Sequence, residues 1–270
     1  MTAESQLLDT ATSIALRAGE LVKRRRSEGV EIAASKSAPE DIVTLADRES
    51  EQLIRDALAE VRPNDGFFGE ESAADAGTSG LTWVVDPIDG TVNYAYDIPA
   101  YAVSIAVVEG DPDPETWRTL AGVVVNPAIG EVFTATTGGG AYLNGRALRV
   151  RTGVELPLAL IGTGFSYSAE LRVRQAAVVG GLIDQVRDIR RIGSAALDLC
   201  SIAAGRLDGF YERMLNPWDH AAGALIAREA GARVGGLAGA LESKELVIAA
   251  EDGLFTRLEV VLASLGVLDD

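Results

Sequence analysis

The stretch WVVDPIDGTVNYAYDIPAYAVSIAVVEG runs from Trp83 to Gly110, and its apolar runs flank two closely spaced aspartates. Its first run is typical of a buried β-strand, and it ends in two carboxylates, Asp86 and Asp89, three residues apart. Charged side chains are seldom placed at the end of a buried strand without a partner. A turn whose aspartates only cap backbone amides is one explanation, and a binding site is the other.

The residues around the two aspartates favour a strand-to-helix junction. Pro87 restricts the backbone, Gly90 permits a sharp turn, and Thr91 is suited to capping a following helix. A second junction of this kind, NPWDHAAGALIAREAG, places Asp219 near the start of another predicted helix. Glu70, in FFGEES, is a third acidic position, although a Glu pair after glycine is by itself more typical of a helix start or a solvated turn.

Three acidic positions therefore lie beside apolar or aromatic runs: Glu70, the Asp86 and Asp89 pair, and Asp219. If they converge, they repel one another unless a cation lies among them. Carboxylate oxygens without paired Cys or His suit the hard cations Mg²⁺, Mn²⁺ and Ca²⁺. Two such ions can activate a water and stabilise the leaving oxygen of a phosphate ester, and helix N-termini favour phosphate. The pattern thus predicts a site for metal and phosphate.

The composition of the chain limits its classes of binding partner and its cellular compartment. The chain has 270 residues and a net charge of −16, which argues against nucleic acid or an anionic membrane as the main partner. One cysteine allows no internal disulfide and indicates a reducing compartment. Because no stretch is apolar enough to span a bilayer and the start lacks a signal-peptide pattern, we expect a cytoplasmic protein.

The hydrophobic pattern predicts an α/β chain in two halves that meet near residue 152. Its first half combines two amphipathic helices with strands, and its second half alternates strands and helices, which suggests a parallel or mixed sheet covered by helices. Asn144-Gly145 is a hairpin-turn signal. We predict helices at 4–28, 45–61, 168–184, 194–205, 218–230 and 252–265, and early strands at 81–86, 102–109, 119–127 and 131–137.

Other phosphatase chemistries fit the sequence less well. Haloacid-dehalogenase-type phosphatases need two aspartates separated by one residue, whereas Asp86 and Asp89 are separated by two, and the chain has no Walker A segment. Cys200 and Arg206 match the C-x5-R spacing of cysteine phosphatases. However, Cys200 lies on the apolar side of a predicted helix, where a phosphate-binding loop does not form. The single histidine, His220, lies in a different predicted element from Cys200.

Taken together, GEES, WVVDPIDGTVNY and NPWDHAAG, in this order, resemble the inositol monophosphatase family of the lithium-sensitive, Mg²⁺-dependent sugar-phosphatase superfamily. The resemblance extends over essentially the whole chain, including SKSAPEDIVTLAD and IGSAALDLCSIAAGRLDGFYE. It implies a layered αβαβα sandwich that is usually a homodimer. We accordingly expect one domain over residues 1–270, with halves of about 1–152 and 153–270.

The resemblance also implies roles for individual residues. Glu70 and Thr91 would orient the attacking water, Asp47 resembles an outer acidic residue near a third metal site, and Lys36 matches a loop that shapes that site. Two or three Mg²⁺ ions, for which Mn²⁺ can substitute, would be held by Glu70, Asp86, Asp89, Asp219 and the carbonyl of Ile88. The substrate side would comprise Asp89, Asp219, the backbone N–H groups of Gly90 and Thr91, and Gly193, Ser194, Ala195 and Glu212.

The implied activity is hydrolysis of inositol monophosphate, or of a similar small polyol or sugar phosphate, by a metal-activated water. Histidinol phosphate, fructose 1,6-bisphosphate and 3′-phosphonucleotides remain alternative substrates. Asp97 stands where many family members carry a basic or neutral residue near the pocket mouth, which leaves substrate choice open. A second class of function is also open, because some similar bacterial proteins act on the transcription machinery through protein contacts. The intact acidic set favours the enzyme.

Overall fold

The computed structural model describes residues 2–35, 42–110 and 113–269, so the prediction for Lys36 lies outside the described residues. Its helices are α1 (Ala3–Glu28), α2 (Leu45–Val61), α3 (Thr91–Ala95), α4 (Ala169–Leu182), α5 (Ala195–Ala203), α6 (Pro217–Glu229) and α7 (Asp252–Ser264), with short 3₁₀ turns η1 (Leu156–Leu158) and η2 (Leu237–Gly239). Its strands are β1 (Ile32–Ser35), β2 (Ile42–Thr44), β3 (Gly66–Gly69), β4 (Leu81–Asp89), β5 (Ala102–Glu109), β6 (Arg118–Asn126), β7 (Glu131–Thr136), β8 (Gly140–Leu143), β9 (Arg146–Ala147), β10 (Leu160–Thr163), β11 (Asp188–Arg190), β12 (Gly209–Glu212), β13 (Arg233–Gly235) and β14 (Val247–Ala250).

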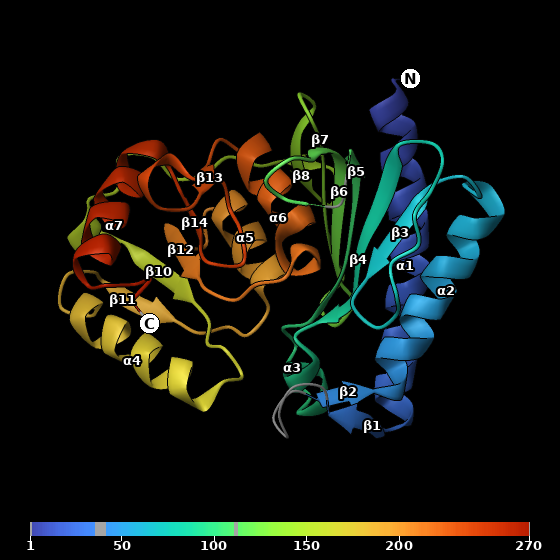
Figure 1. Cartoon of the computed structure of the whole chain (residues 1–270), viewed down its shortest axis with the longest axis horizontal. Helices are drawn as coiled ribbons and strands as arrows, with labels where there is room; N and C mark the ends of the chain where they lie inside the picture. Colours follow the sequence, from blue (N-terminus) through green and yellow to red (C-terminus); the bar gives the residue numbers. More distant parts are fainter. Residues whose placement is uncertain (1, 36–41, 111–112, 270) are drawn as a thin grey trace.

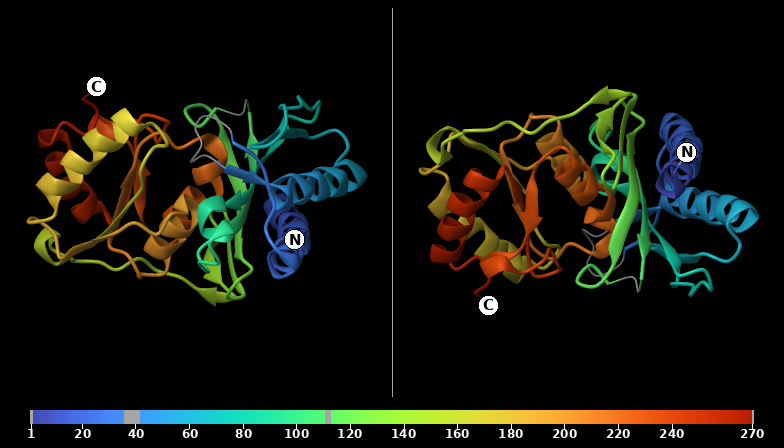
Figure 2. Two further views of the ribbon diagram at one scale, coloured as in Figure 1. Left: turned by 90° about the horizontal axis from the view of Figure 1, so that it is seen from below. Right: turned by 90° about the horizontal axis from the view of Figure 1, so that it is seen from above.

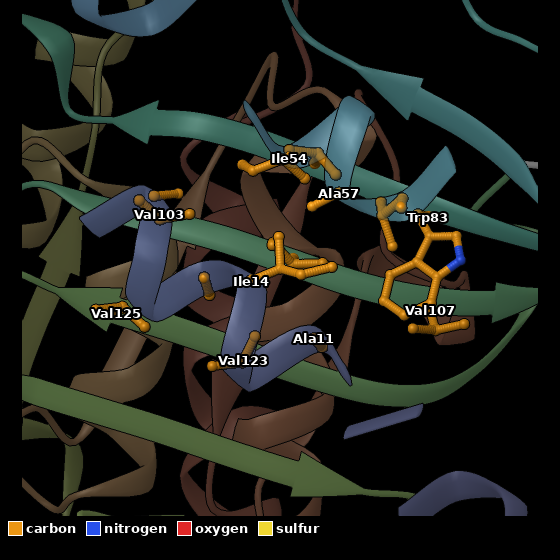
Figure 3. Packing of buried hydrophobic residues seen from close by; sticks show 14 of the residues in the cluster. Ala11, Ile14, Ile54, Ala57, Trp83, Val103, Val107, Val123 and Val125 are labelled. Atoms are coloured by element: carbon orange, nitrogen blue, oxygen red, sulfur yellow. The ribbon is translucent and has the colours of Figure 1, made fainter. Parts of the chain in front are cut away.

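The larger sheet has seven strands in the order β3-β4-β5-β6-β7-β8-β9. β3 and β4 pair in parallel, and the other neighbours are antiparallel. Helices α1 and α2 cover one face, where Ile14 and Ile54 pack against Trp83 and Val103 (Figure 3). The amphipathic pattern at 4–28 and 45–61 therefore reflects two helices on one side of this sheet.

Strand β5 shows why the central strands read as continuous apolar runs. Val103, Ile105 and Val107 join the core under α1 and α2, whereas the alternate residues Ala102 and Ala106 belong to the core on the opposite face. Successive side chains of a strand point to opposite faces, so a strand covered on both faces is apolar throughout. The sheet is thus an inner layer of the molecule.

Helices α5 and α6 form the layer between the two sheets (Figures 1 and 2). On α5, Cys200 contributes to the core against the larger sheet, while Leu199 and Ile202 pack in the core beside the smaller one. Every residue of α5 is buried, which explains its apolar composition. Cys200 is a buried free thiol in the middle of this helix, as expected from the sequence.

The smaller sheet is mixed, in the order β11-β10-β12-β14-β13, and confirms the prediction from alternating strands and helices. Helices α4 and α7 cover its outer face, with Leu182 and Phe255 in the core between them and the sheet. The layers therefore run α1/α2, larger sheet, α5/α6, smaller sheet, α4/α7 (Figure 1). This order confirms the αβαβα sandwich.

Several local features differ from the sequence-based expectations. Strand β3 was missed, because a four-residue run flanked by glycines gives little periodic signal. Strand β4 extends to Asp89 instead of ending at Asp86. Because α5 and α6 contribute to cores on both sides, we propose that the two halves fold as one domain. Among the described residues, no helix has both the length and the apolar composition needed to span a bilayer.

Candidate active site

Parallel pairing of β3 with β4 brings Glu70 to Asp86. The register pairs Gly69 with Val85, so the next residues in the two strands, Glu70 and Asp86, emerge side by side at the ends of the strands. Burial raises the pKa of Asp86, and the nearby Glu70 carboxyl helps to raise it. The ends of the two strands therefore place two carboxyl groups next to each other, where a cation would relieve their repulsion.

A β-bulge in β4 places Asp89 on the same side of the strand as Asp86. Asp86 pairs with Ser104 and Asp89 with Ala102, so three steps along β4 oppose two steps along β5. In a regular strand, residues three apart would point to opposite faces, and the extra residue restores the same face. With this bulge, the three-residue spacing in DPID brings the two carboxylates to the same face of β4.

The N-terminus of α5 holds Asp89 from the other half of the chain. The Ser194 hydroxyl and the Ala196 amide each donate to Oδ2 of Asp89 at 2.7 Å. Gly90 makes this approach possible: its φ is +94°, and a Cβ there would lie 3.1 Å from the Gly193 carbonyl oxygen and 3.4 Å from Cβ of Ser194. Asp89 is consequently fixed through one oxygen, and Oδ1 is left for a ligand.

Asp219 reaches the same region from the first turn of α6. It is the third residue of the helix after Pro217, and its Oδ2 accepts a hydrogen bond from the Asn216 amide at 2.6 Å. Asp219 therefore caps the helix, as expected of an aspartate with a structural role only, but it also lines the cavity described below. Edge-to-face packing of Trp218 on Phe68, with ring centroids 5.2 Å apart, connects this turn to β3.

Thr91 does not cap α3, contrary to the sequence-based expectation. Gly90 occupies the N-cap position, and Thr91 is the first residue of the helix. Its hydroxyl instead lies 3.1 Å from Oδ1 of Asp47 and 3.0 Å from the Ile88 carbonyl oxygen and can donate to either. Asp47 is 1% exposed and is also held through Oδ2 by the amide and hydroxyl of Thr44.

One cavity of about 1050 Å³ between the two halves brings most of the predicted site together. Its lining includes Glu70, Asp86, Ile88, Asp89, Gly90, Thr91, Gly193, Ser194, Ala195, Glu212 and Asp219. Asp47 is not part of the lining; it lies behind Thr91. The sequence motifs are therefore brought together by the sandwich, with the acidic residues of β3, β4 and α6 facing residues that follow β11 and β12.

The electrostatics of the cavity are those of crowded, buried carboxylates. Burial and the charges of Glu70, Asp89 and Asp219 raise the pKa of Asp86 well above its ordinary value, and burial with Glu70 does the same for Asp219. Burial raises the pKa of Asp89 to about 6, although the hydrogen bonds from α5 oppose the rise. Burial also raises the pKa of Asp47 to about 7. Without a cation these groups favour their protonated forms.

The donors fit a hard cation. All are oxygens, and Asp86, Asp89 and Asp219 each keep one carboxylate oxygen bound to a protein donor, which fixes their orientation. In residues 2–35, 42–110 and 113–269, no three Asp, Glu, His or Cys side chains already surround one point as a finished metal centre.

Several lining residues were missed by the sequence reasoning. Basic and hydroxyl groups of the second half line the cavity opposite the aspartates: Ser166, Tyr167, Ser168, Arg172, Arg191, Arg213 and Lys244. These come from loops, strand ends and the first turn of α4, and they belong to no recognisable motif. Arg191 had one available signal, since it immediately precedes the IGSAA segment. His220 is 1% exposed, and burial lowers its pKa to about 3, so it does not resemble a proton carrier at neutral pH.

Comparison with known proteins identifies the family. The inositol-1-monophosphatase SuhB of Mycobacterium tuberculosis is 48% identical over 248 residues, which cover 85% of this chain and 83% of that protein. The Nus factor SuhB of Escherichia coli K12 is 41% identical over 236 residues, 86% of each chain. Among solved structures, Mycobacterium tuberculosis SuhB matches with a TM-score of 0.82 and 43% identity over 100% of both chains. The extragenic suppressor protein suhB of Bartonella henselae matches with a TM-score of 0.87 and 36% identity over 95% of this chain and 98% of that chain. Because a model of the inositol monophosphatase family also matches residues 3–264, the chain belongs to the inositol monophosphatase family.

Proposed function

We propose that this protein is a Mg²⁺-dependent phosphomonoesterase that hydrolyses inositol monophosphate or a similar small polyol phosphate. The observation that carries the proposal is the convergence of Glu70, Asp86, Asp89 and Asp219, from three separate parts of the chain, on one cavity. The Mycobacterium tuberculosis relative, named an inositol-1-monophosphatase, supports the same activity. Family membership also supports a homodimer, and the buried thiol of Cys200 supports a cytoplasmic location.

The four carboxylates, with the Ile88 carbonyl, would hold two or three Mg²⁺ ions, and Mn²⁺ has the same ligand preferences. When bound, such ions neutralise phosphate charge and make water acidic enough to act as a nucleophile near neutral pH. The chain contributes the positions of these ligands. The Ser194 hydroxyl and the Ala196 amide fix the orientation of Asp89, and the Asn216 amide fixes that of Asp219.

Thr91 and Asp47 supply a path for a proton. When the Thr91 hydroxyl donates to Oδ1 of Asp47, its lone pairs are available to accept a hydrogen bond from a water in the cavity. That water can lose its proton to Thr91 as Thr91 passes its own to Asp47. Asp47, with a pKa of about 7, is suited to accept a proton near neutral pH. Glu70, beside Asp86, would orient the same water.

We expect Thr91→Ala to lower kcat by about 10²–10⁴-fold, the usual contribution of a positioned proton-transfer group, with little change in KM. Steady-state kinetics with inositol 1-phosphate and Mg²⁺ measure this. Cys200→Ala is the control and should leave kcat unchanged, because the thiol is buried in α5. A folded Cys200→Ala variant without activity would instead support a cysteine phosphatase.

The pH dependence of stability should reveal the crowded carboxylates. Their folded-state pKa values lie above the unfolded values, so the metal-free protein binds extra protons on folding and loses stability as pH rises from about 5 to 8. Mg²⁺ favours the ionised carboxylates, so its stabilising effect should grow over the same range. Melting curves at pH 6 and pH 8, with chelator and with Mg²⁺, measure this. An Mg²⁺-induced rise in Tm that is equal at both pH values would contradict the expectation.

The substrate is tested by phosphate release with Mg²⁺ over inositol 1-phosphate, histidinol phosphate, fructose 1,6-bisphosphate, a 3′-phosphonucleotide and phenyl phosphate. We expect the highest kcat/KM for inositol 1-phosphate and a measurable rate for phenyl phosphate. Absence of Mg²⁺-dependent release from every ester would refute the phosphomonoesterase.

A second candidate function is a protein contact with the transcription machinery, which the name of the Escherichia coli relative, Nus factor SuhB, favours. Such a protein contact does not depend on the carboxylates of the cavity. Capture of transcription proteins by immobilised Asp89→Asn, to the same extent as by wild type, would support an independent binding role. Failure of both proteins to capture them would remove this candidate.

A further inference from the structure

A buried polar stripe on α2 lies behind the acidic side of the cavity. Its members, Asp47, Ser50 and Glu51, are at helical spacing on one side of α2 and are 1%, 0% and 2% exposed. The side of a helix that covers a sheet is normally apolar, and carboxylates are seldom fully buried. Packing of α2 on the larger sheet therefore does not by itself explain these three residues.

Two residues of the stripe contact the DPIDGT turn. The Thr91 hydroxyl lies 3.1 Å from Oδ1 of Asp47, and the Ser50 hydroxyl donates to the Pro87 carbonyl oxygen at 3.3 Å. Asp47 belongs to the proposed proton path, and Ser50 holds the backbone of the turn. Glu51, next to Ser50 on α2, instead contacts the chain at the end of β3.

The carboxylate of Glu51 contacts the chain on both sides of Glu70. Its Oε2 accepts a hydrogen bond from the Glu71 amide at 2.8 Å. On the other side of Glu70, a Cβ on Gly69 would lie 2.7 Å from Cδ of Glu51 and closer still to Oε2, so a side chain at position 69 would displace the carboxylate. The register of β3 with β4 ends at Gly69, so the segment beyond it depends on contacts outside the sheet.

We infer that Glu51 is a positioning residue for the metal site: its carboxylate fixes the backbone on both sides of Glu70 and so holds the Glu70 carboxyl beside Asp86. Glu70 belongs to no helix or strand, so contacts of its neighbours set its direction. Groups that orient a metal ligand typically change metal affinity or activity about 10- to 100-fold when they are removed. The inference rests on the proposed Mg²⁺ binding and deepens it, because Glu51 is not part of the cavity lining.

Three substitutions of Glu51 test whether its hydrogen bond is what matters. Glu51→Gln keeps an acceptor for the Glu71 amide at nearly the same volume, so its Kd for Mg²⁺ should stay close to that of wild type. Glu51→Leu fills the buried position without an acceptor, so its Kd should rise about 10- to 100-fold. Glu51→Met, unbranched and at most a weak acceptor, is a second apolar variant and should behave like Glu51→Leu.

Glu229 provides a matched control at the far end of α6 from Asp219. Its two carboxylate oxygens accept from the Gly138 and Gly140 amides at 2.8 Å each, and it is not part of the cavity lining. Glu229→Leu removes the same kind of bond, from a backbone amide to a carboxylate. It should lower Tm in chelator and leave the Kd for Mg²⁺ unchanged, whereas loss of the Glu51 bond should change both.

Isothermal titration calorimetry with Mg²⁺ alone, below the Tm of every variant, measures these Kd values without substrate. The Mg²⁺ concentration that gives half-maximal phosphate release from inositol 1-phosphate should shift by the same factor as Kd. A wild-type Kd in folded Glu51→Leu or Glu51→Met would overturn the inference. So would an equal loss of affinity in Glu51→Gln, because the charge of Glu51 rather than its hydrogen bond would then be required. Absence of calorimetric Mg²⁺ binding by wild type would instead refute the proposed function on which the inference rests.

Discussion

Asp89→Asn should lower kcat by about a thousandfold with inositol 1-phosphate and Mg²⁺, while the protein remains folded. A metal-binding carboxylate contributes several kcal/mol to the transition state, and each 1.4 kcal/mol or so is a tenfold change in rate. The amide has nearly the same volume, and its carbonyl oxygen can still accept from the Ser194 hydroxyl or the Ala196 amide. The loss should therefore come from chemistry rather than from unfolding.

Circular dichroism and a thermal melt in chelator establish that Asp89→Asn is folded, and phosphate release measures kcat. Asp188→Asn is a suitable control, since Asp188 is paired with Arg190 outside the cavity. It should retain wild-type turnover. Near wild-type activity of folded Asp89→Asn at saturating Mg²⁺ would show that Asp89 is not a metal ligand.

The layers of the fold could be predicted from local pattern because the elements are long or strongly periodic. The run at 102–109 is typical of a strand, and the segment that forms α5 has the apolar side expected of a helix. The order of the strands within each sheet could not be predicted from local pattern. Parallel pairing of β3 with β4, which brings Glu70 to Asp86, depends on a four-residue strand whose pattern gives almost no signal.

The candidate site could be predicted at its carboxylates but not at their supports. Two aspartates directly after a buried strand are improbable without a function, so Asp86 and Asp89 could be predicted as site residues. The β-bulge that aligns them arises from pairing with β5 and cannot be read from spacing alone. The contact of Ser194 with Asp89 joins residues 105 positions apart in the sequence, so no local pattern predicts it.

Asp86→Asn should have opposite effects on stability with and without metal. Asp86 is 2% exposed and surrounded by Glu70, Asp89 and Asp219, so ionising these carboxyl groups together is unfavourable in the metal-free protein, and one substitution relieves this. An asparagine amide carries no charge beside Glu70, and its oxygen can still accept from the Ile88 amide. Without metal the variant should be at least as stable as wild type.

Bound Mg²⁺ adds about 2.7 kcal/mol to the folded state at a hundredfold excess over Kd. A chain of this length changes Tm by roughly 2–4 °C for each kcal/mol, so wild type should gain about 5–10 °C on adding Mg²⁺. Asp86→Asn should lose most of that gain, because a ligand shared by the cations is gone. An aspartate that only caps a turn would instead cost roughly 0.5–2 kcal/mol in either buffer.

Thermal melts of wild type and Asp86→Asn, each with chelator and with excess Mg²⁺, test the metal-cluster account of DPIDGT most directly. The account predicts a crossing: in chelator the variant melts at or above the wild-type temperature, and in Mg²⁺ it melts several degrees below. Parallel losses in both buffers, with an equal Mg²⁺-induced rise in Tm for the two proteins, would contradict it.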